Sequence, residues 1–123
     1  METSLPTKKK ILVVDDDESM RVVLCEFLAE GGFSAQGVDS GTSALALLRE
    51  SHFDAVITDY EMPGMDGIEL IREIRSRNPY LFIIGVSGHG SAKDFMRAGA
   101  NFFFPKPLQY EEVLLALKIL LCW

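Results

Sequence analysis

The sequence has few cysteines, no long apolar run and no extended basic segment, and each shortage excludes a class of protein. Two cysteines, Cys25 and Cys122, give no framework of disulfide bonds, which is typical of a reducing cytoplasmic setting. No apolar stretch reaches the length of a bilayer span, and the N-terminal METSLPTKKK lacks the apolar core of a signal peptide. We therefore expect a cytoplasmic protein that does not insert into a membrane.

Basic residues are scarce relative to acidic ones. The chain has 12 Lys and Arg against 18 Asp and Glu, a net charge of −6 and a pI near 4.8. A nucleic-acid surface needs clustered Lys and Arg. The only basic run, KKK at residues 8–10, precedes a predicted strand and is interpreted as a solubilising segment. The sequence thus predicts no direct contact with nucleic acid.

What the chain does have is the composition of one globular domain. It has 123 residues, of which 48% are hydrophobic and 24% charged, enough to bury a core of its own. We expect a short tail at residues 1–9 and a single domain at residues 10–123. No linker, repeat or low-complexity stretch interrupts it.

Five short apolar segments alternate with five segments of helical periodicity. Strands are predicted at residues 11–14, 33–38, 55–58, 81–86 and 101–104. Helices are predicted at residues 18–30, 41–48, 68–77, 91–98 and 108–121. The connections have room only for βα units, which predicts an α/β fold with a parallel sheet and helices on both faces. Right-handed crossovers then bring the carboxyl ends of all strands to one edge.

Polar side chains follow four of these strands. In the stretch AVITDYEMPG (residues 55–64) a buried strand runs directly into Asp59, and burying a bare carboxylate is costly unless a cation pairs with it. The other strand-end residues are Asp15, Asp16 and Asp17 after the first strand, Ser87 after the fourth and Lys106 after the fifth. Carboxylates suit Mg²⁺, a carboxylate can itself be phosphorylated, and an ammonium and a hydroxyl can stabilise a transferring phosphoryl group.

Four motifs in this order, VVDD, TDYEMPGMDG, VSG and AGANFFFPKP, resemble the receiver domain of two-component response regulators. The likeness runs from Lys10 to the last helix. It implies a flavodoxin-like (βα)5 fold with the strand order 2-1-3-4-5. It also implies a phosphoprotein that acts as a signalling switch in a two-component system or phosphorelay.

The resemblance implies a role for each matching residue. Asp59 would be the phosphoacceptor that forms an aspartyl phosphate. Magnesium, or manganese, would be bound by Asp16 and Asp59 directly, by Asp15 through water and by the backbone carbonyl of Glu61. Ser87 and Lys106 would contact the phosphoryl oxygens.

Other family features map onto this sequence as well. Phe103 matches the aromatic residue whose rotamer reports activation, although Phe102, Phe103 and Phe104 are also expected to be mostly core. The resemblance implies a cis peptide bond between Lys106 and Pro107. Glu61 and His89 occupy positions that tune autodephosphorylation in the family, but an exposed loop histidine is the simpler interpretation of His89.

The implied partner is a sensor histidine kinase or a histidine phosphotransfer protein that donates from a phosphohistidine. The switch would change conformation at the face made by the fourth helix, the fifth strand and the last helix. The chain would not be an enzyme beyond its own phosphorylation and autodephosphorylation.

Two segments depart from the expected pattern. Between Ser87 and Gly99 the chain is about one helical turn shorter than is usual in the family, so the fourth helix should be short. The last helix is apolar nearly all round, with Leu108, Leu115, Ile119, Cys122 and Trp123 opposite its core stripe. A helix of this kind is usually buried, so one hypothesis is that a second copy (a homodimer) or an output partner contacts this face; an ordinary, fraying end is the alternative.

The sequence leaves other functions open. Asp15 and Asp17 imitate the DxD start of haloacid-dehalogenase-like phosphatases, a reading that leaves Asp59 without a role. A receiver fold kept only as a phosphorylation-independent interaction module would not need the full set of site residues. More simply, Asp15, Asp16 and Asp17 can cap the first helix, and Asp17 is well placed to do so.

Overall fold

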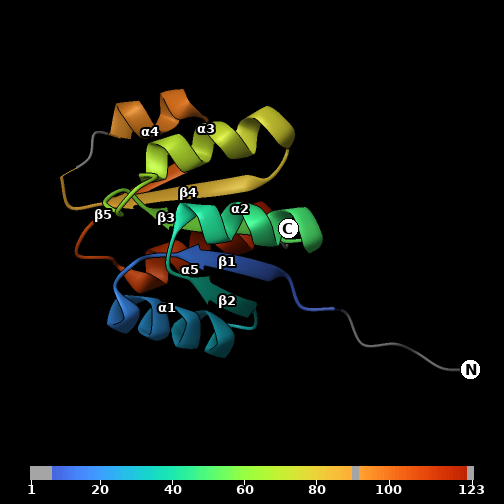
Figure 1. Ribbon diagram of the computed structural model, residues 1–123. Helices are drawn as coiled ribbons and strands as arrows, with labels where there is room; N and C mark the ends of the chain where they lie inside the picture. Colours follow the sequence, from blue (N-terminus) through green and yellow to red (C-terminus); the bar gives the residue numbers. More distant parts are fainter. Residues whose placement is uncertain (1–6, 90–91, 122–123) are drawn as a thin grey trace, which may run out of the picture.

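A five-stranded sheet lies between two layers of helices in the computed structural model, which describes residues 7–89 and 92–121 (Figure 1). The strands are β1 (Lys10–Val14), β2 (Ser34–Val38), β3 (Ala55–Asp59), β4 (Phe82–Ser87) and β5 (Phe102–Pro105). The helices are α1 (Glu18–Glu30), α2 (Gly41–Glu50), α3 (Gly67–Arg77), α4 (Ala92–Ala98) and α5 (Tyr110–Leu121). Strands and helices alternate along the chain, as the sequence predicts.

All strand pairs in the sheet are parallel, and the order is β2-β1-β3-β4-β5. Helices α2, α3 and α4 cover one face, while α1 and α5 cover the other (Figure 1). The fold class and strand order expected from the sequence are therefore confirmed. No helix within residues 7–89 and 92–121 is long and apolar enough to cross a membrane.

The core consists of two clusters, one on each face of the sheet. Side chains of β1 alternate between them: Leu12 and Val14 pack toward α2 and α3, while Ile11 and Val13 pack toward α1 and α5. Strands β1 and β3 are buried on both faces, which explains why their sequences are continuously apolar rather than alternating.

The register of the sheet brings the polar strand ends level with one another. Val14 pairs with Thr58, so the residues that follow them, Asp15 and Asp59, are neighbours across two strands. On the next strands Asp59 pairs with Val86, and Ser87 pairs with Pro105. Parallel pairing therefore gathers residues that are up to 91 positions apart in the chain, from Asp15 to Lys106, at one edge.

Capping side chains determine where the helices next to this edge begin. The Asp17 side chain accepts a hydrogen bond from the Met20 N–H and caps α1, as anticipated. Asp66 begins α3 with a capping box, in which Asp66 and Glu69 each accept the other's backbone N–H. Asn78 ends α3 at the predicted Asn-Pro pair.

The structure corrects one expectation about the core and refines several boundaries. Phe102 is 40% exposed rather than buried, because β5 is an edge strand; Phe103 and Phe104 are half-buried. Strand β4 starts at Phe82 and includes Ser87, and α5 begins only at Tyr110. Helix α4 has seven residues, which confirms that it is short.

Candidate functional site

Asp59 is the last residue of β3 and is only 7% exposed. Its Oδ1 atom accepts the backbone N–H of Tyr60 at 2.9 Å and lies 3.2 Å from the Lys106 Nζ. Burial raises the pKa of the Asp59 carboxyl above its usual value, and the Lys106 ammonium offsets this effect only in part. The cation that a buried carboxylate requires is thus supplied by Lys106, 47 residues later in the chain.

The backbone around Asp59 is fixed from both sides. The Tyr60 N–H donates to the Val86 carbonyl at 3.0 Å, and the Tyr60 carbonyl accepts the Gly67 N–H at 2.9 Å. A Cβ atom at Gly67 would overlap the Asp59 carbonyl oxygen. Glycine is therefore required where α3 begins, and the close approach of α3 to β3 holds the carboxylate in place.

Asp15 follows β1 and lies beside Asp59. It is 8% exposed, and its Oδ1 atom accepts the Asp17 N–H at 2.9 Å. Its carbonyl oxygen accepts a hydrogen bond of 2.7 Å from the Arg21 guanidinium. Burial raises the pKa of the Asp15 carboxyl, and the Asp59 charge adds to this effect. Asp16, by contrast, is exposed.

Three carboxylates come together at this edge. Asp15, Asp16 and Asp59 each offer one oxygen, and these oxygens all lie within 4.8 Å of one another. Two oxygens on one Mg²⁺ are at most about 4.2 Å apart, because each Mg–O bond is about 2.1 Å. Small side-chain movements would bring the three to one ion, and a single ammonium leaves their charge unbalanced, so these residues fit a divalent cation.

These carboxylates line an open cavity together with acidic and apolar residues of the loop after β3. Glu61, Met62, Pro63 and Asp66 contribute to it, and Lys106 closes one side. The exposed Glu61, whose backbone carbonyl is the predicted metal ligand, is thus placed beside the Asp cluster. Asp17 also lines the cavity while it caps α1.

Ser87 and Lys106 are held on the neighbouring strands. Ser87 is 2% exposed, its Oγ atom accepts the His89 N–H at 3.0 Å, and its carbonyl accepts the Lys106 N–H at 3.0 Å. Burial lowers the pKa of the Lys106 ammonium, but the charge and hydrogen bond of Asp59, together with the charges of Asp15 and Glu61, outweigh burial and the net shift is upward. Lys106 therefore stays charged at neutral pH. The Lys106–Pro107 bond is cis, as the resemblance implies.

An aromatic row connects this edge to α4. The Phe103 ring lies 5.1 Å from the Phe95 ring, and Phe95 lies 5.9 Å from Tyr60, the residue after Asp59. A Cβ atom at Gly85 would overlap the Phe95 ring. Sequence reasoning missed Phe95 and Gly85; the only signal for them was a glycine inside the apolar strand LFIIGV, which often marks a close approach.

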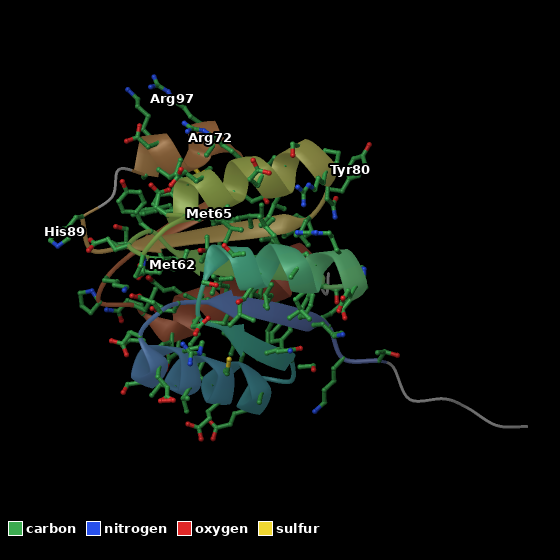
Figure 2. All side chains as sticks on the ribbon, in the orientation of Figure 1. Met62, Met65, Arg72, Tyr80, His89 and Arg97 are labelled. Atoms are coloured by element: carbon green, nitrogen blue, oxygen red, sulfur yellow. The ribbon has the colours of Figure 1, made fainter. Side chains whose placement is uncertain are left out.

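His89 is not brought to the carboxylates. Figure 2 shows it projecting from the loop after β4, and the described residues that line the acidic cavity include Glu61 but not His89. Its backbone N–H, rather than its ring, is what contacts Ser87. Of the apolar residues opposite the core stripe of the last helix, Leu115 and Ile119 are 58% and 57% exposed, while Leu108 is half-buried. Cys122 and Trp123 lie outside the described residues.

Several known proteins resemble this chain over most of its length. It is 38% identical over 108 residues to the response regulator protein FleR of Pseudomonas aeruginosa, an alignment that covers 85% of this chain and 23% of FleR. It is 36% identical to the response regulator MprA of Mycobacterium sp., covering 91% of this chain and 50% of MprA. It is 37% identical to the chemotaxis protein CheY-3 of Vibrio cholerae, covering 87% of each chain. The chain thus spans about a quarter of FleR and half of MprA.

Solved structures and a family model agree with these relatives. A response regulator receiver protein from Pseudomonas putida superimposes with a TM-score of 0.87 at 32% identity, covering 94% of this chain and 99% of that one. The chemotaxis response regulator CheY4 of Vibrio cholerae gives a TM-score of 0.85 at 29% identity, covering 94% of this chain and all of that one. The family model of the response regulator receiver domain matches residues 11–118. On these grounds the chain belongs to the response regulator receiver domain family.

Proposed function

We propose that this receiver domain is a phosphoacceptor switch of a two-component system or phosphorelay. Asp59 takes a phosphoryl group from the phosphohistidine of a sensor histidine kinase or a histidine phosphotransfer protein. The observation that carries the proposal is the buried Asp59 carboxylate, paired with Lys106 at 3.2 Å and joined by two further carboxylates at the same edge. A purely structural acid would not need this convergence.

In the proposed transfer, an ionised Asp59 oxygen attacks phosphorus while the bond from phosphorus to the imidazole nitrogen of the donor breaks. The bonding pair leaves with the donor imidazole, and an acyl phosphate forms on Asp59. Lys106 neutralises charge on the phosphoryl oxygens, and the Ser87 hydroxyl donates to one of them. A Mg²⁺ held by Asp16 and Asp59, by Asp15 through water and by the Glu61 carbonyl would supply further charge neutralisation.

The signal would be read on the face of α4, β5 and α5. The phosphoryl group adds negative charge beside Ser87 and Lys106, at one end of the row formed by Tyr60, Phe95 and Phe103. On α5 the exposed Leu115 and Ile119 offer apolar area to a second copy or to an output protein.

We also propose a cytoplasmic location, and no catalysis beyond self-phosphorylation and autodephosphorylation. Glu61 borders the acidic cavity and is the better-placed of the two tuning residues, since His89 lies outside that cavity. The lifetime of the phosphoryl group would then depend chiefly on how far the Glu61 side chain lets the attacking water reach the acyl phosphate.

The proposal is tested by identifying the phosphorylated residue. The protein is incubated with a phosphohistidine donor and Mg²⁺, treated with borohydride, which reduces an acyl phosphate to an alcohol, and mapped by peptide mass. The expected product is reduced Asp59. Reduction at Asp15 instead would support the phosphatase-like chemistry and overturn the proposal. The absence of any reduced aspartate would also overturn the proposal.

A further inference from the structure

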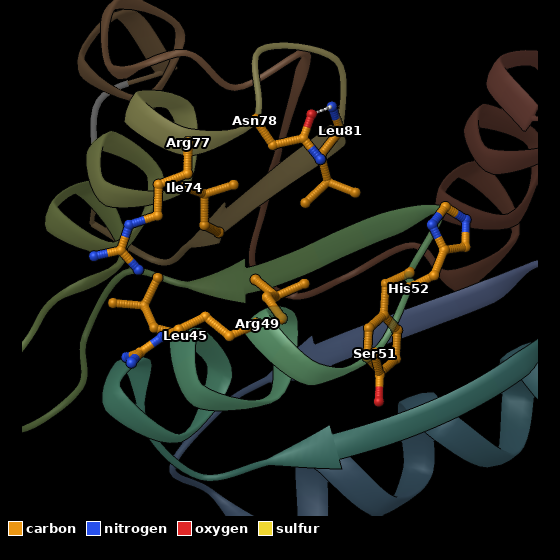
Figure 3. Close-up of a pocket in the computed structure, with 10 residues that line it drawn as sticks. Leu45, Arg49, Ser51, His52, Ile74, Arg77, Asn78 and Leu81 are labelled. Carbon is orange, nitrogen blue, oxygen red and sulfur yellow. Dashed lines mark hydrogen bonds between the residues drawn. The ribbon is translucent and has the colours of Figure 1, made fainter.

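A second cavity lies at the opposite edge of the sheet from Asp59. It has a volume of about 360 Å³ and sits between the last turns of α2 and α3, above the segments that lead into β3 and β4 (Figure 3). Small-molecule sites typically begin at about 300 Å³. Nothing in the proposed phosphoryl transfer uses this cavity, so what it can hold is a separate question.

The floor of the cavity is apolar and rigid. Leu45 of α2, Ile74 of α3 and Phe53 and Leu81 of the segments before β3 and β4 line it, and each is less than 10% exposed. Such side chains belong to the core and keep their positions, because neighbouring groups pack against them on the other sides. The half-buried Leu48 adds an apolar wall. The cavity is therefore formed by the fold itself rather than by mobile surface side chains.

The rim of the cavity is basic, although the chain as a whole carries a net charge of −6. Arg49 comes from α2 and Arg77 from α3, and Figure 3 shows their guanidinium groups extending to the same side of the cavity as Leu45. None of the ten described residues that line it is acidic, whereas the cavity beside Asp59 has six acidic residues among the described residues that line it. The charge of this site thus complements an anion.

Both guanidinium groups remain available to a ligand. Within the described residues Arg49 makes no hydrogen bond or ion pair. Arg77 lies 3.6 Å from Glu73, one turn earlier, in a pair whose side chains are about half exposed; such pairs contribute little. Basic residues near a helix end often offset its partial negative charge, but Arg77 is directed back along α3 toward Glu73 and away from the end.

Asn78 adds a donor with a fixed orientation. Its Oδ1 atom accepts the N–H groups of Tyr80 at 2.9 Å and Leu81 at 3.2 Å, which leaves the amide NH₂ as the group free to donate. The cavity has two guanidinium groups and an amide at its rim and an apolar floor beneath them. This arrangement matches a carboxylic acid, which has a charged carboxylate at one end and an apolar body at the other. A carboxylate accepts bidentate bonds from guanidinium groups, and the apolar body fills the floor.

We propose that this cavity binds a small organic carboxylate whose apolar body is about the size of one aromatic ring or a short branched chain. The carboxylate is held between Arg49 and Arg77, and the body lies against Leu45, Phe53 and Ile74. This is a ligand site in addition to the phosphoacceptor site, and its existence does not depend on the proposed function.

The test uses benzoate as the probe and the backbone amide NMR signals of the full chain as the readout. Benzoate is expected to give saturable shifts that centre on Leu48, Phe53 and Asn78, with a Kd of about 1 mM, since small ligands of this size rarely bind more tightly. Benzyl alcohol keeps the ring and acetate keeps the charge, and each should bind at least about tenfold more weakly. Equal binding of benzyl alcohol, or no saturable shift with benzoate, would overturn the proposal.

Charge variants separate the cavity from the rest of the surface. Arg49→Gln combined with Arg77→Gln should weaken benzoate binding at least about tenfold. Arg72→Gln is the matched control, because Arg72 lies on α3 but points away from the cavity (Figure 2). Unchanged benzoate affinity in the double variant would contradict the assigned site. Both variants should retain phosphorylation at Asp59, so a failure here is distinct from a failure of the proposed function.

Discussion

At the scale of single residues, the site balances the cost of burial against one ion pair. Asp59 and Asp15 are both nearly buried and both have a raised pKa, with burial as the leading cause. The Lys106 ammonium, at 3.2 Å from Asp59, counters this only in part, together with the backbone N–H groups of Tyr60 and Asp17. The protein therefore bears the cost of burying two carboxylates. A divalent cation beside them, or a phosphoryl group on Asp59, would reduce that cost.

Replacing Lys106 tests that balance at Asp59. In Lys106→Met the Asp59 pKa should rise further, because the ionised form loses its charged partner while burial remains. Phosphorylation by a small acyl phosphate should slow by about 100-fold, the usual effect of removing one electrostatic donor. The pKa is followed through the Asp59 carboxyl carbon by NMR.

Lys93→Met is the control for this change, because Lys93 is exposed on α4. It should leave both the Asp59 titration and the phosphorylation rate unaltered. An Asp59 titration that is the same in Lys106→Met as in the wild type would show that the ion pair does not govern this carboxylate.

Asp15→Asn tests the same balance through stability. Burial raises the folded pKa of Asp15 above the ordinary value of 3.8, so above that pH the folded state holds more protons than the unfolded chain. Wild-type stability should then fall as the pH rises through the folded pKa. Asparagine cannot ionise but keeps an acceptor for the Asp17 N–H, so the variant should be more stable at pH 7 by about 1 kcal/mol, a common gain at functional sites.

Urea denaturation at pH 3 and pH 7 without divalent cations measures this difference. The advantage of Asp15→Asn should disappear at pH 3, where the carboxyl is protonated in both states. The exposed Asp39 provides a control in Asp39→Asn. A variant that is less stable than wild type at pH 7 would mean that Asp15 contributes more as an ionised acceptor than its burial costs.

At the scale of elements, the position of Asp59 depends on how closely α3 approaches β3. Gly67→Ala places a Cβ against the Asp59 carbonyl and the Tyr60 backbone, which cannot move without breaking strand pairing. We expect the free energy of unfolding to fall by about 3 kcal/mol, as for overpacking at a site that does not relax. Gly88→Ala is the control, because among the described residues its Cβ would meet only the Lys106 Cβ, at 3.9 Å. Equal stability of the two variants by urea denaturation would contradict this view.

Arg75 of α3 makes hydrogen bonds to the segment that follows the short α4. The Arg75 Nε donates to the Gly99 carbonyl at 2.8 Å, and another of its nitrogens donates to the Asn101 side chain at 2.9 Å. Arg75→Gln should cost about 1–2 kcal/mol of stability and speed hydrogen exchange of the amides from Ala92 to Asn101. Arg72 is exposed on α3, so Arg72→Gln should change neither the stability nor these exchange rates. Uniform acceleration across the chain would argue against a local role.

The elements show why sequence reasoning reached some features and missed others. Continuous apolar strands fixed the alternation of β and α units, and the strand ends placed Asp15, Asp59, Ser87 and Lys106 at one edge. The exposed Phe102 was expected in the core, because an apolar run does not reveal that its strand lies at the edge of a sheet. Contacts between elements, such as Phe95 on Gly85, leave no periodic signal in a single sequence.

At the scale of the whole molecule, the two edges of the sheet have opposite character. Asp15, Asp16 and Asp59 converge at the carboxyl edge, while Arg49 and Arg77 flank an apolar cavity at the amino edge. The parallel register separates the two, since strand ends that meet at one edge are necessarily far from strand starts. The second cavity escaped sequence reasoning because Arg49 and Arg77 end different helices and become neighbours only when α2 and α3 pack side by side.

The most direct test of the account is the intact mass of the protein after incubation with a small acyl phosphate. Wild type and Asp59→Asn are compared with Mg²⁺ and with a chelator, and Asp39→Asn serves as a control for the loss of one carboxylate. The account predicts a gain of one phosphoryl group that requires Mg²⁺, persists in Asp39→Asn and is absent in Asp59→Asn. A gain that survives Asp59→Asn, or no gain in wild type from either an acyl phosphate or a phosphohistidine donor, would contradict it.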